Sequence, residues 1–435
     1  MDAFLASLTN IGLRLRQSLT PKMFGVTSRG SVASVPALIM SLKDSDLSVR
    51  RSAAEALGSI GAPAVPFLIG AFQDAESDFG VRSAAAYGLG VSGSAAGSAV
   101  YLLGGALKDR NQYVRYSSAW ALGSIGFKAA APALTEALKD SDLYVRCAAA
   151  WALGQLGSTH ESVVPVLIEA LNDHFSPLEE RIHAVHCAAA EALRKIGTAA
   201  VPALVEELKN SDRYYSRHAV VRLLGEIGSE TAVPVLTAAL KDADVAIRDA
   251  AAGALGEIGP EAKAAVPALV AALKEEVWCV RAAAAGALGH VDPGAKEAIK
   301  GLIAALKDKD SDVSGSAARA LSRIGPAAVP ALIAALKDEE SDARVEAAFI
   351  LSEIGPEAKE AVPALIDALE DVEGGVRAEA ARALESITGP VGTDKPALIG
   401  VLLDNGRRVL QRAADAFAKA GPVLKSEGGR YGRME

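Results

Sequence analysis

Apolar and polar positions recur along this chain with a period of about 33 residues. Each period opens on a Pro-x-Leu segment, passes through a short polar turn and closes on an alanine-rich stretch. In the first period Leu38, Ile39 and Leu42 form an apolar stripe. Spacings of three and four residues place side chains on one face of a helix. The pattern predicts two helices per period, with eleven clear copies between about residues 35 and 389 and a degenerate twelfth ending near residue 421.

The ends of the two helices are marked by residues with known capping behaviour. Pro36 opens the first helix, where the missing N–H has no intrahelical partner. Asp44 and Asp46 lie in the turn and are expected to cap the second helix, which Gly58 or Gly61 ends.

These features resemble the HEAT-repeat family, in the bacterial subclass named after phycobilisome lyases. The matching residues are the Pro-x-Leu of the first helix, the aspartate of the turn and the Val-Arg-x-Ala-Ala-x-x-Leu-Gly of the second helix. The resemblance covers most of the chain. It implies an all-α fold, a right-handed α-solenoid of about twelve two-helix repeats with the second helix of each repeat on the concave side.

The chain is expected to divide into three parts. Residues 1–30 are predicted to form a capping helix and linker, residues 31–421 a single continuous solenoid, and residues 422–435 a flexible tail. The predicted N-terminal helix is amphipathic and carries Arg14 and Arg16, so contact with a membrane surface or a partner stays an alternative to capping.

Composition supports close helix packing and argues against several partners. Half of the residues are hydrophobic but only 5% are aromatic, so alanine supplies much of the apolar surface. The net charge of −8 disfavours nucleic acid as a partner.

Three cysteines and no visible secretory signal favour a cytoplasmic location. The uncharged residues 83–107 are interrupted by glycine and serine, so no transmembrane segment is expected.

An arginine recurs at one position of the second helix in nine of the eleven copies. An acidic residue recurs in the turn, as at Asp44, Asp109 and Asp140. We predict that guanidinium and carboxylate groups of successive repeats form a structural ladder, because a catalytic pair would not recur. The ladder arginines are Arg50, Arg82, Arg115, Arg146, Arg217, Arg248, Arg281, Arg344 and Arg377.

Function is expected where the copies differ. Positions two before, one after and five after the ladder arginine share one helix face and vary most. In copies two to six they hold many of the chain's aromatic rings, which predicts a partner-binding surface; the alternative is that the rings pack along neighbouring helices. The candidate partner-binding residues are Tyr87, Tyr113, Tyr116, Trp120, Tyr144, Trp151, Glu191, Tyr215, His218 and Arg222.

A second irregularity is an insertion within residues 173–185 of copy five. His183 near the end of this range, together with His186 and Cys187, has the spacing i, i+3 and i+4 that places side chains on one helical face, and zinc accepts such ligands. The spacing matches no established metal motif, so ordinary surface histidines are the favoured interpretation and no metal or other cofactor is expected.

The sequence therefore favours a non-enzymatic scaffold or adaptor that binds a protein or peptide through the concave face. The alternative, which the subclass resemblance implies, is a bilin lyase or isomerase acting on a chromophore-carrying protein, with Cys147 or Cys187 holding the tetrapyrrole. A HEAT-like DNA glycosylase is disfavoured, since the variable positions mix acidic and basic residues.

Overall fold

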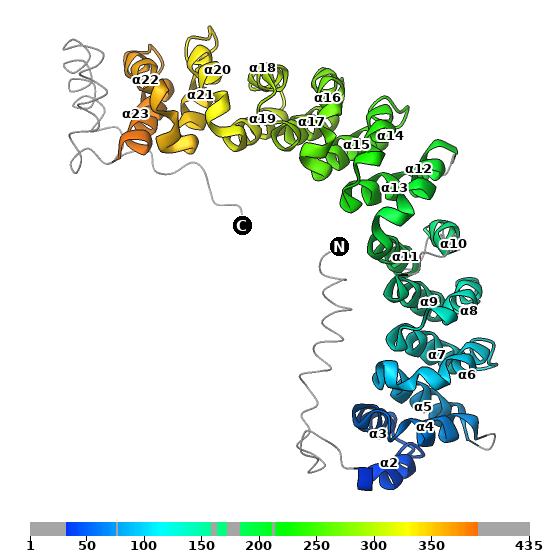
Figure 1. Ribbon diagram of the computed structural model, residues 1–435. Coiled ribbons are helices and arrows are strands. Elements are labelled where there is room, and N and C mark those ends of the chain that lie inside the picture. The colour runs from blue at the N-terminus through cyan, green and yellow to red at the C-terminus, as the bar shows by residue number, and fades with distance from the viewer. Residues whose placement is uncertain (1–31, 75–76, 158–162, 172–182, 211–213, 390–435) are drawn as a thin grey trace. The chain divides into compact units, whose positions relative to one another are not determined.

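A computed structural model of the chain describes residues 32–74, 77–157, 163–171, 183–210 and 214–389. Throughout these ranges the secondary structure is helical, with no strand, and the α-helices follow one another as eleven pairs (Figure 1). The predicted all-α solenoid of two-helix repeats is confirmed. The degenerate twelfth copy lies outside the described residues, and the right-handed sense of the superhelix stays a prediction.

Each pair consists of a shorter helix A and a longer helix B. The A helices are α2 (Val35–Ser41), α4 (Val65–Gln73), α6 (Val100–Ala106), α8 (Ala131–Ala137), α10 (Val163–Ala170), α12 (Val201–Asn210), α14 (Val233–Ala239), α16 (Val266–Ala272), α18 (Lys296–Ala305), α20 (Val329–Ala335) and α22 (Val362–Ala368). The B helices are α3 (Leu47–Ile60), α5 (Phe79–Val91), α7 (Gln112–Ile125), α9 (Leu143–Leu156), α11 (His183–Ile196), α13 (Tyr214–Ile227), α15 (Val245–Ile258), α17 (Trp278–Val291), α19 (Ser311–Ile324), α21 (Ser341–Ile354) and α23 (Gly374–Thr388).

Short 3-10 helices lead into many of the A helices. They are η2 (Val32–Ser34), η3 (Gly93–Ala99), η4 (Lys128–Ala130), η5 (Gly197–Ala200), η6 (Glu230–Ala232), η7 (Gly259–Ala265), η8 (Gly325–Ala328) and η9 (Gly355–Ala361).

Asp46 and Gly61 cap the first B helix as predicted, and several later B helices begin and end in the same way. Asp46 accepts a hydrogen bond from the backbone N–H of Ser48 at 2.7 Å, and Asp142 accepts from the N–H groups of Tyr144 and Val145. These contacts satisfy N–H groups that have no partner inside the helix. At the other end of α7, Gly126 adopts φ 81°, a left-handed conformation that favours glycine.

The uncharged residues 83–107 do not form one continuous helix. They cover most of α5, then η3, then α6, and the chain turns at Gly93 with φ 57°. Among the helices of the described ranges, none combines the length and the apolar character that crossing a membrane requires.

The core explains the excess of alanine. Each B helix buries one leucine completely, as at Leu122 and Leu153, and surrounds it with buried alanines. The B helices of successive repeats approach so closely that a Cβ atom on Gly123 would lie 2.6 Å from the Cα of Ala152. Only small side chains permit this separation.

The contacts divide the chain into two compact units. The first ends at Ala203 and the second begins at Leu204. In the first unit α3, α5, α7, α9 and α11 pack in succession, and in the second α13, α15, α17, α19, α21 and α23 do the same. The predicted capping segment 1–30 and tail 422–435 lie outside the described residues, and the prediction that 31–421 is a single domain stays a prediction.

Candidate functional site

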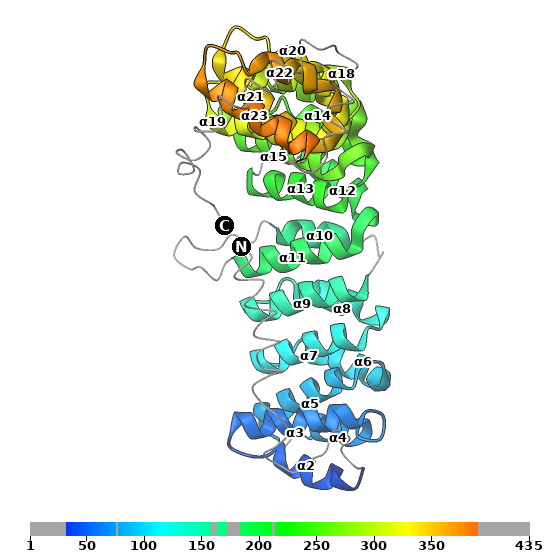
Figure 2. The same cartoon turned by 90° about the vertical axis from the view of Figure 1, so that its left-hand side faces the viewer.

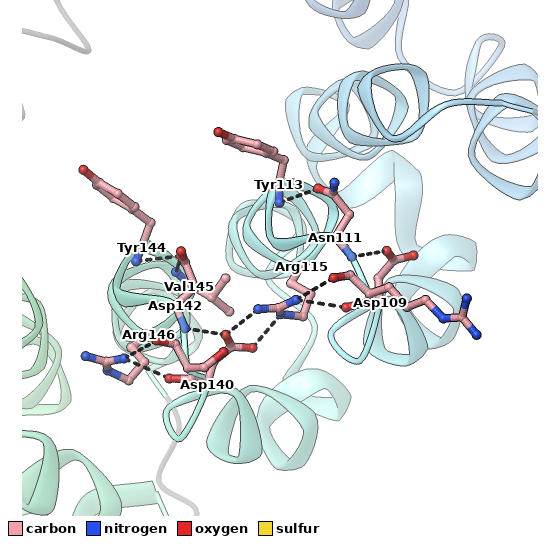
Figure 3. Close-up of polar contacts among 11 residues, drawn as sticks. Asp109, Asn111, Tyr113, Arg115, Asp140, Asp142, Tyr144, Val145 and Arg146 are labelled. Atoms are coloured by element: carbon pink, nitrogen blue, oxygen red, sulfur yellow. Dashed lines mark hydrogen bonds and ion pairs between the residues drawn. The ribbon is translucent and has the colours of Figure 1, made fainter.

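The ladder arginine ties the turn of its own repeat to the turn of the next. Arg115 Nε and Nη2 donate to the two carboxylate oxygens of Asp140 at 2.7 and 2.8 Å, and Arg115 Nη1 donates to the backbone carbonyl of Asp109 at 3.0 Å (Figure 3). Asp140 also accepts from the N–H of Asp142 at 2.8 Å. One guanidinium therefore holds two successive turns with charge-assisted hydrogen bonds.

The same contacts recur in the second unit. Arg281 makes two hydrogen bonds to Asp308, at 2.7 and 2.8 Å, and these hold the pKa of the Asp308 carboxyl below its usual range. Further ion pairs of this kind join Arg82 to Asp109, Arg217 to Asp242, Arg248 to Glu275 and Arg344 to Asp371. Arg50, Arg146 and Arg377 donate to carbonyls of their own turns. Because the same arginine contacts recur in repeat after repeat, they belong to the scaffold.

Two copies lack the arginine, and the structure shows what stands there. In copy five, His186 Nδ1 lies 2.9 Å from the carbonyl oxygen of Leu171. In copy nine, where the position is Ser314, Lys307 Nζ pairs with Asp338 of the next repeat at 2.6 Å. Sequence reasoning missed Lys307, because lysine holds the same turn position in copies that keep the arginine.

Three candidate rings form a stack across successive B helices of the first unit. The ring centroids of Tyr87 and Trp120 are 4.7 Å apart, with planes inclined by 26°. Those of Trp120 and Trp151 are 6.2 Å apart, with planes inclined by 6°. All three side chains are half-buried. We call Tyr87, Trp120 and Trp151 the ring stack.

Glycines of the preceding helices receive the indoles of the ring stack. A Cβ on Gly90 would lie 2.5 Å from Cζ3 of Trp120, and a Cβ on Gly123 would lie 2.7 Å from Cζ3 of Trp151. Each indole therefore rests its benzo edge on the backbone of the neighbouring helix. Trp120 and Trp151 therefore pack along neighbouring helices, as the alternative interpretation of these rings expected.

Polar contacts hold both ends of the ring stack. The Tyr87 hydroxyl donates to Glu55 Oε1 at 3.0 Å, and the Arg51 guanidinium lies 5.3 Å from the Tyr87 ring centroid. Burial and the Glu55 carboxylate raise the pKa of Tyr87, so its hydroxyl stays a donor. At the other end, Gln155 with its amide oxygen facing the donors accepts from Trp151 Nε1 at 2.9 Å and Lys195 Nζ at 2.6 Å.

Other rings on these helices are exposed. Tyr113 and Tyr144 leave 56% and 53% of their surface accessible, and Tyr116 leaves 41%. Phe79, which is 48% exposed, stacks on Tyr113 with centroids 6.0 Å apart. Sequence reasoning missed Phe79 because it lies one position outside the chosen set, although an aromatic residue in the first helical turn was a usable signal.

Tyr113 and Tyr144 occupy the same position in adjacent repeats. Each lies in the first turn of its B helix, and both side chains extend in the same direction, away from the ladder (Figure 3). We call Phe79, Tyr113 and Tyr144 the exposed ring row.

The helices that carry these rings contain few charged side chains. Apart from the ladder arginine, α5, α7 and α9 contain no charged side chain. Charges return on the flanking helices, where Arg51 pairs with Glu55 on α3 and Arg194 pairs with Glu191 on α11. The helices α5, α7 and α9 follow one another in the first unit (Figure 2). We call the surface formed on them by the ring stack, the exposed ring row and Tyr116 the uncharged aromatic face, which Arg51 and Glu55 border at Tyr87.

The other predicted binding residues do not all join this face. Glu191 lies at its edge in the ion pair with Arg194. His218 and Arg222 belong to α13 in the second unit, where Arg222 pairs with Glu226 at 3.4 Å. The side chain of Tyr215 lies outside what the structure describes, so its predicted role stays a prediction.

The metal-ligand candidates are placed in part. His186 contacts the carbonyl of Leu171, Cys187 is half-buried on α11, and the side chain of His183 is outside the described residues, as is most of the 173–185 insertion. Within the described ranges no three His, Cys, Asp or Glu side chains come together as a metal site would require.

Comparison with family models agrees with the repeat geometry. The model described as HEAT repeats matches residues 22–90, 101–184, 201–289, 266–341 and 329–418. The chain belongs to the HEAT-repeat family. A second model, the PBS lyase HEAT-like repeat, matches residues 185–210 of this HEAT-repeat chain and confirms the subclass resemblance. No curated protein sequence matches the chain.

Solved structures with a similar fold include importin beta and the karyopherin Kap121p. Importin beta is 14% identical with a TM-score of 0.53, and the match covers 91% of this chain and 63% of that one. Kap121p is 15% identical with a TM-score of 0.55, covering 86% and 47%. Kap121p bound to the extreme C-terminus of the protein phosphatase Cdc14p is 16% identical with a TM-score of 0.54, covering 98% and 54%. The chain thus spans less than two thirds of these proteins, and identity this low shows the fold alone.

Proposed function

We propose that this protein is a non-catalytic scaffold or adaptor that holds a protein or peptide partner on the uncharged aromatic face of its first unit. The observation that supports this most directly is the exposure of Tyr113 and Tyr144 on helices whose only charged side chain is the ladder arginine. Large exposed rings that contribute little to packing are typical of binding hot spots.

The energetics of the face suit partner binding. Tyrosine buries a large apolar area while losing few rotamers, and its hydroxyl provides hydrogen bonds at a partly wet interface. Because α5, α7 and α9 carry only ladder arginines as charged groups, a partner covers the face without desolvating an unpaired charge.

The solved relatives support the class of function. Kap121p, which shares this fold, has been seen bound to the C-terminal end of another protein. A HEAT-repeat stack is therefore able to hold a protein segment, which is the role proposed for this chain.

The test uses a double variant in which Tyr113→Ser and Tyr144→Ser are combined. The wild-type and variant proteins are immobilised, exposed to lysate of the native host, and the retained proteins are compared by quantitative mass spectrometry. The matched control is Tyr101→Ser, because Tyr101 is 85% exposed but lies on helix A α6.

We expect at least one protein that the wild type and Tyr101→Ser retain equally and that the double variant loses by tenfold or more. A set of retained proteins identical for all three baits, with all three folded by circular dichroism, would contradict the proposed function.

A further inference from the structure

We propose that the partner segment is an uncharged, proline-rich peptide in the extended polyproline II conformation, lying across α7 and α9 on the exposed ring row. This inference rests on the proposed function, since it names the chemistry of the segment that the same face would hold.

The first argument is hydrogen-bonding chemistry. The face offers aromatic rings and donors: the hydroxyls of the exposed tyrosines Tyr113, Tyr116 and Tyr144. A proline-rich segment is the complement, because proline lacks a backbone N–H and presents carbonyl acceptors together with flat apolar rings.

The second argument is spacing. Tyr113 and Tyr144 occupy the same position of adjacent B helices and extend in parallel (Figure 3). Packed helices lie about 8–10 Å apart. A polyproline II helix rises about 3.1 Å per residue with three residues per turn, so prolines at i and i+3 lie about 9.3 Å apart. Prolines at i and i+3 therefore match the general separation of two side chains at the same position of adjacent packed helices, and a third proline continues toward α5, where Phe79 stacks on Tyr113.

The third argument concerns the alternatives for the bound segment. The face consists of helices, whose backbone groups are already paired, so it offers no edge for an added β-strand. A charged peptide would meet no free counter-charge on α7, because Arg115 is engaged by Asp140 and by the carbonyl of Asp109. A polyproline II segment is already ordered before it binds. It therefore loses less conformational entropy on binding a face that offers only side-chain contacts.

The experiment uses two fluorescein-labelled peptides of twelve residues. The probe repeats Pro-Leu-Pro four times, and the matched peptide carries alanine in place of every proline, which keeps the leucines but favours a helix. Fluorescence anisotropy gives the dissociation constant of each peptide for the full chain, for the combined Tyr113→Ser and Tyr144→Ser variant, and for Tyr101→Ser.

We expect the wild type to bind the probe at least tenfold more tightly than the alanine peptide. We also expect the double tyrosine variant to bind the probe at least tenfold more weakly than the wild type, and Tyr101→Ser to bind it within twofold of the wild type. Each of these results supports the inference.

Three results would overturn it. Equal affinity for both peptides, lost in the double variant, would show that the face binds a segment other than polyproline II and would leave the proposed function standing. Equal affinity of the wild type and the double tyrosine variant for the probe would place the binding site elsewhere. Absence of probe binding would contradict a proline-rich partner. The lysate comparison above would then decide the proposed function separately.

Discussion

The uncharged aromatic face of α5, α7 and α9 and the corresponding surface of α15 and α17 share one scaffold but differ at the position five residues after the ladder arginine. The first has Tyr87, Trp120 and Trp151 there, and the second has Gly253 and Gly286. A Cβ atom on either glycine would contact nothing within 4 Å. The fold therefore does not dictate this position, and rings there need a reason beyond the repeat itself.

Removing a ladder arginine should lower stability by a similar amount in both regions. This is the largest effect that we expect. Arg115→Ala and Arg281→Ala each leave a mostly buried aspartate without its guanidinium. We expect each to lower the free energy of unfolding by about 3 kcal/mol, the usual result of removing one partner of a buried pair. Chemical denaturation measures the loss, and hydrogen exchange locates it in the two adjoining repeats.

The control for the ladder is Arg377→Ala. Arg377 is exposed, and among the described residues its hydrogen bonds go to the carbonyls of Asp371 and Val372 in its own turn, so a smaller loss is expected. Losses that differ strongly between Arg115→Ala and Arg281→Ala would show that the two regions do not share one scaffold.

The half-buried and the exposed rings of the aromatic face should differ in how much they contribute to the free energy of unfolding. Trp151→Ala removes a half-buried indole that stacks on Trp120 and rests on Gly123, so we expect a loss of about 2 kcal/mol in the free energy of unfolding. Tyr144→Ala removes an exposed ring and should change it by less than about 0.5 kcal/mol. The same denaturation experiment checks both, and similar losses would mean that Tyr144 also serves the fold.

The bare glycines of the second region should tolerate a side chain. Gly253→Ala and Gly286→Ala fill open space in helix interiors, where alanine is preferred by about 0.5–1 kcal/mol, so each should raise the melting temperature. Gly123→Ala is the matched control and should lower it, since its Cβ would press on the backbone of Ala152. A decrease for Gly253→Ala or Gly286→Ala would show that the second region needs its bare backbone.

The smallest effect is expected from mild acid, which should distinguish α21 of the second unit from α7 of the first. In the second unit, burial and the nearby Glu379 and Asp342 raise the pKa of Glu346, so its charge opposes folding at neutral pH. Lowering the pH through the raised folded pKa, toward the ordinary value of about 4.3, should therefore add stability. Hydrogen exchange in α21 at pH 7 and pH 5, corrected for intrinsic rates, measures this, and Glu346→Gln should abolish the difference.

The helix α7 of the first unit should lack this gain. Although burial opposes the shift, the hydrogen bond from Arg115 holds the pKa of Asp140 below its usual range. Its contribution is fully present above about pH 4 and is lost only as the pH falls through the lowered folded pKa. Equal protection changes in α7 and α21 between pH 7 and pH 5 would contradict this distinction.

The repeat pattern sufficed for most of the fold because each helix end depends on residues within a few positions. Asp142 and Gly126 cap their helices through contacts with their immediate neighbours, and such contacts follow from local sequence. The binding candidates were also found locally, by comparing equivalent positions of successive copies.

Contacts between repeats were harder to predict. The stacking of Trp120 on Trp151 and the resting of each indole on a glycine depend on side-chain rotamers and helix separation, which no spacing rule provides. The replacement of the missing arginine by Lys307 depends on the same geometry. The sequence therefore located the rings but did not show which of them are packed and which are exposed.

The most direct test of the account measures stability and partner affinity on one variant, the combined Tyr113→Ser and Tyr144→Ser. If these rings serve binding, the free energy of unfolding stays within about 0.5 kcal/mol of wild type while affinity for the retained partner falls at least tenfold, a loss of about 1.4 kcal/mol. A variant that loses stability but keeps the wild-type affinity would contradict the central claim.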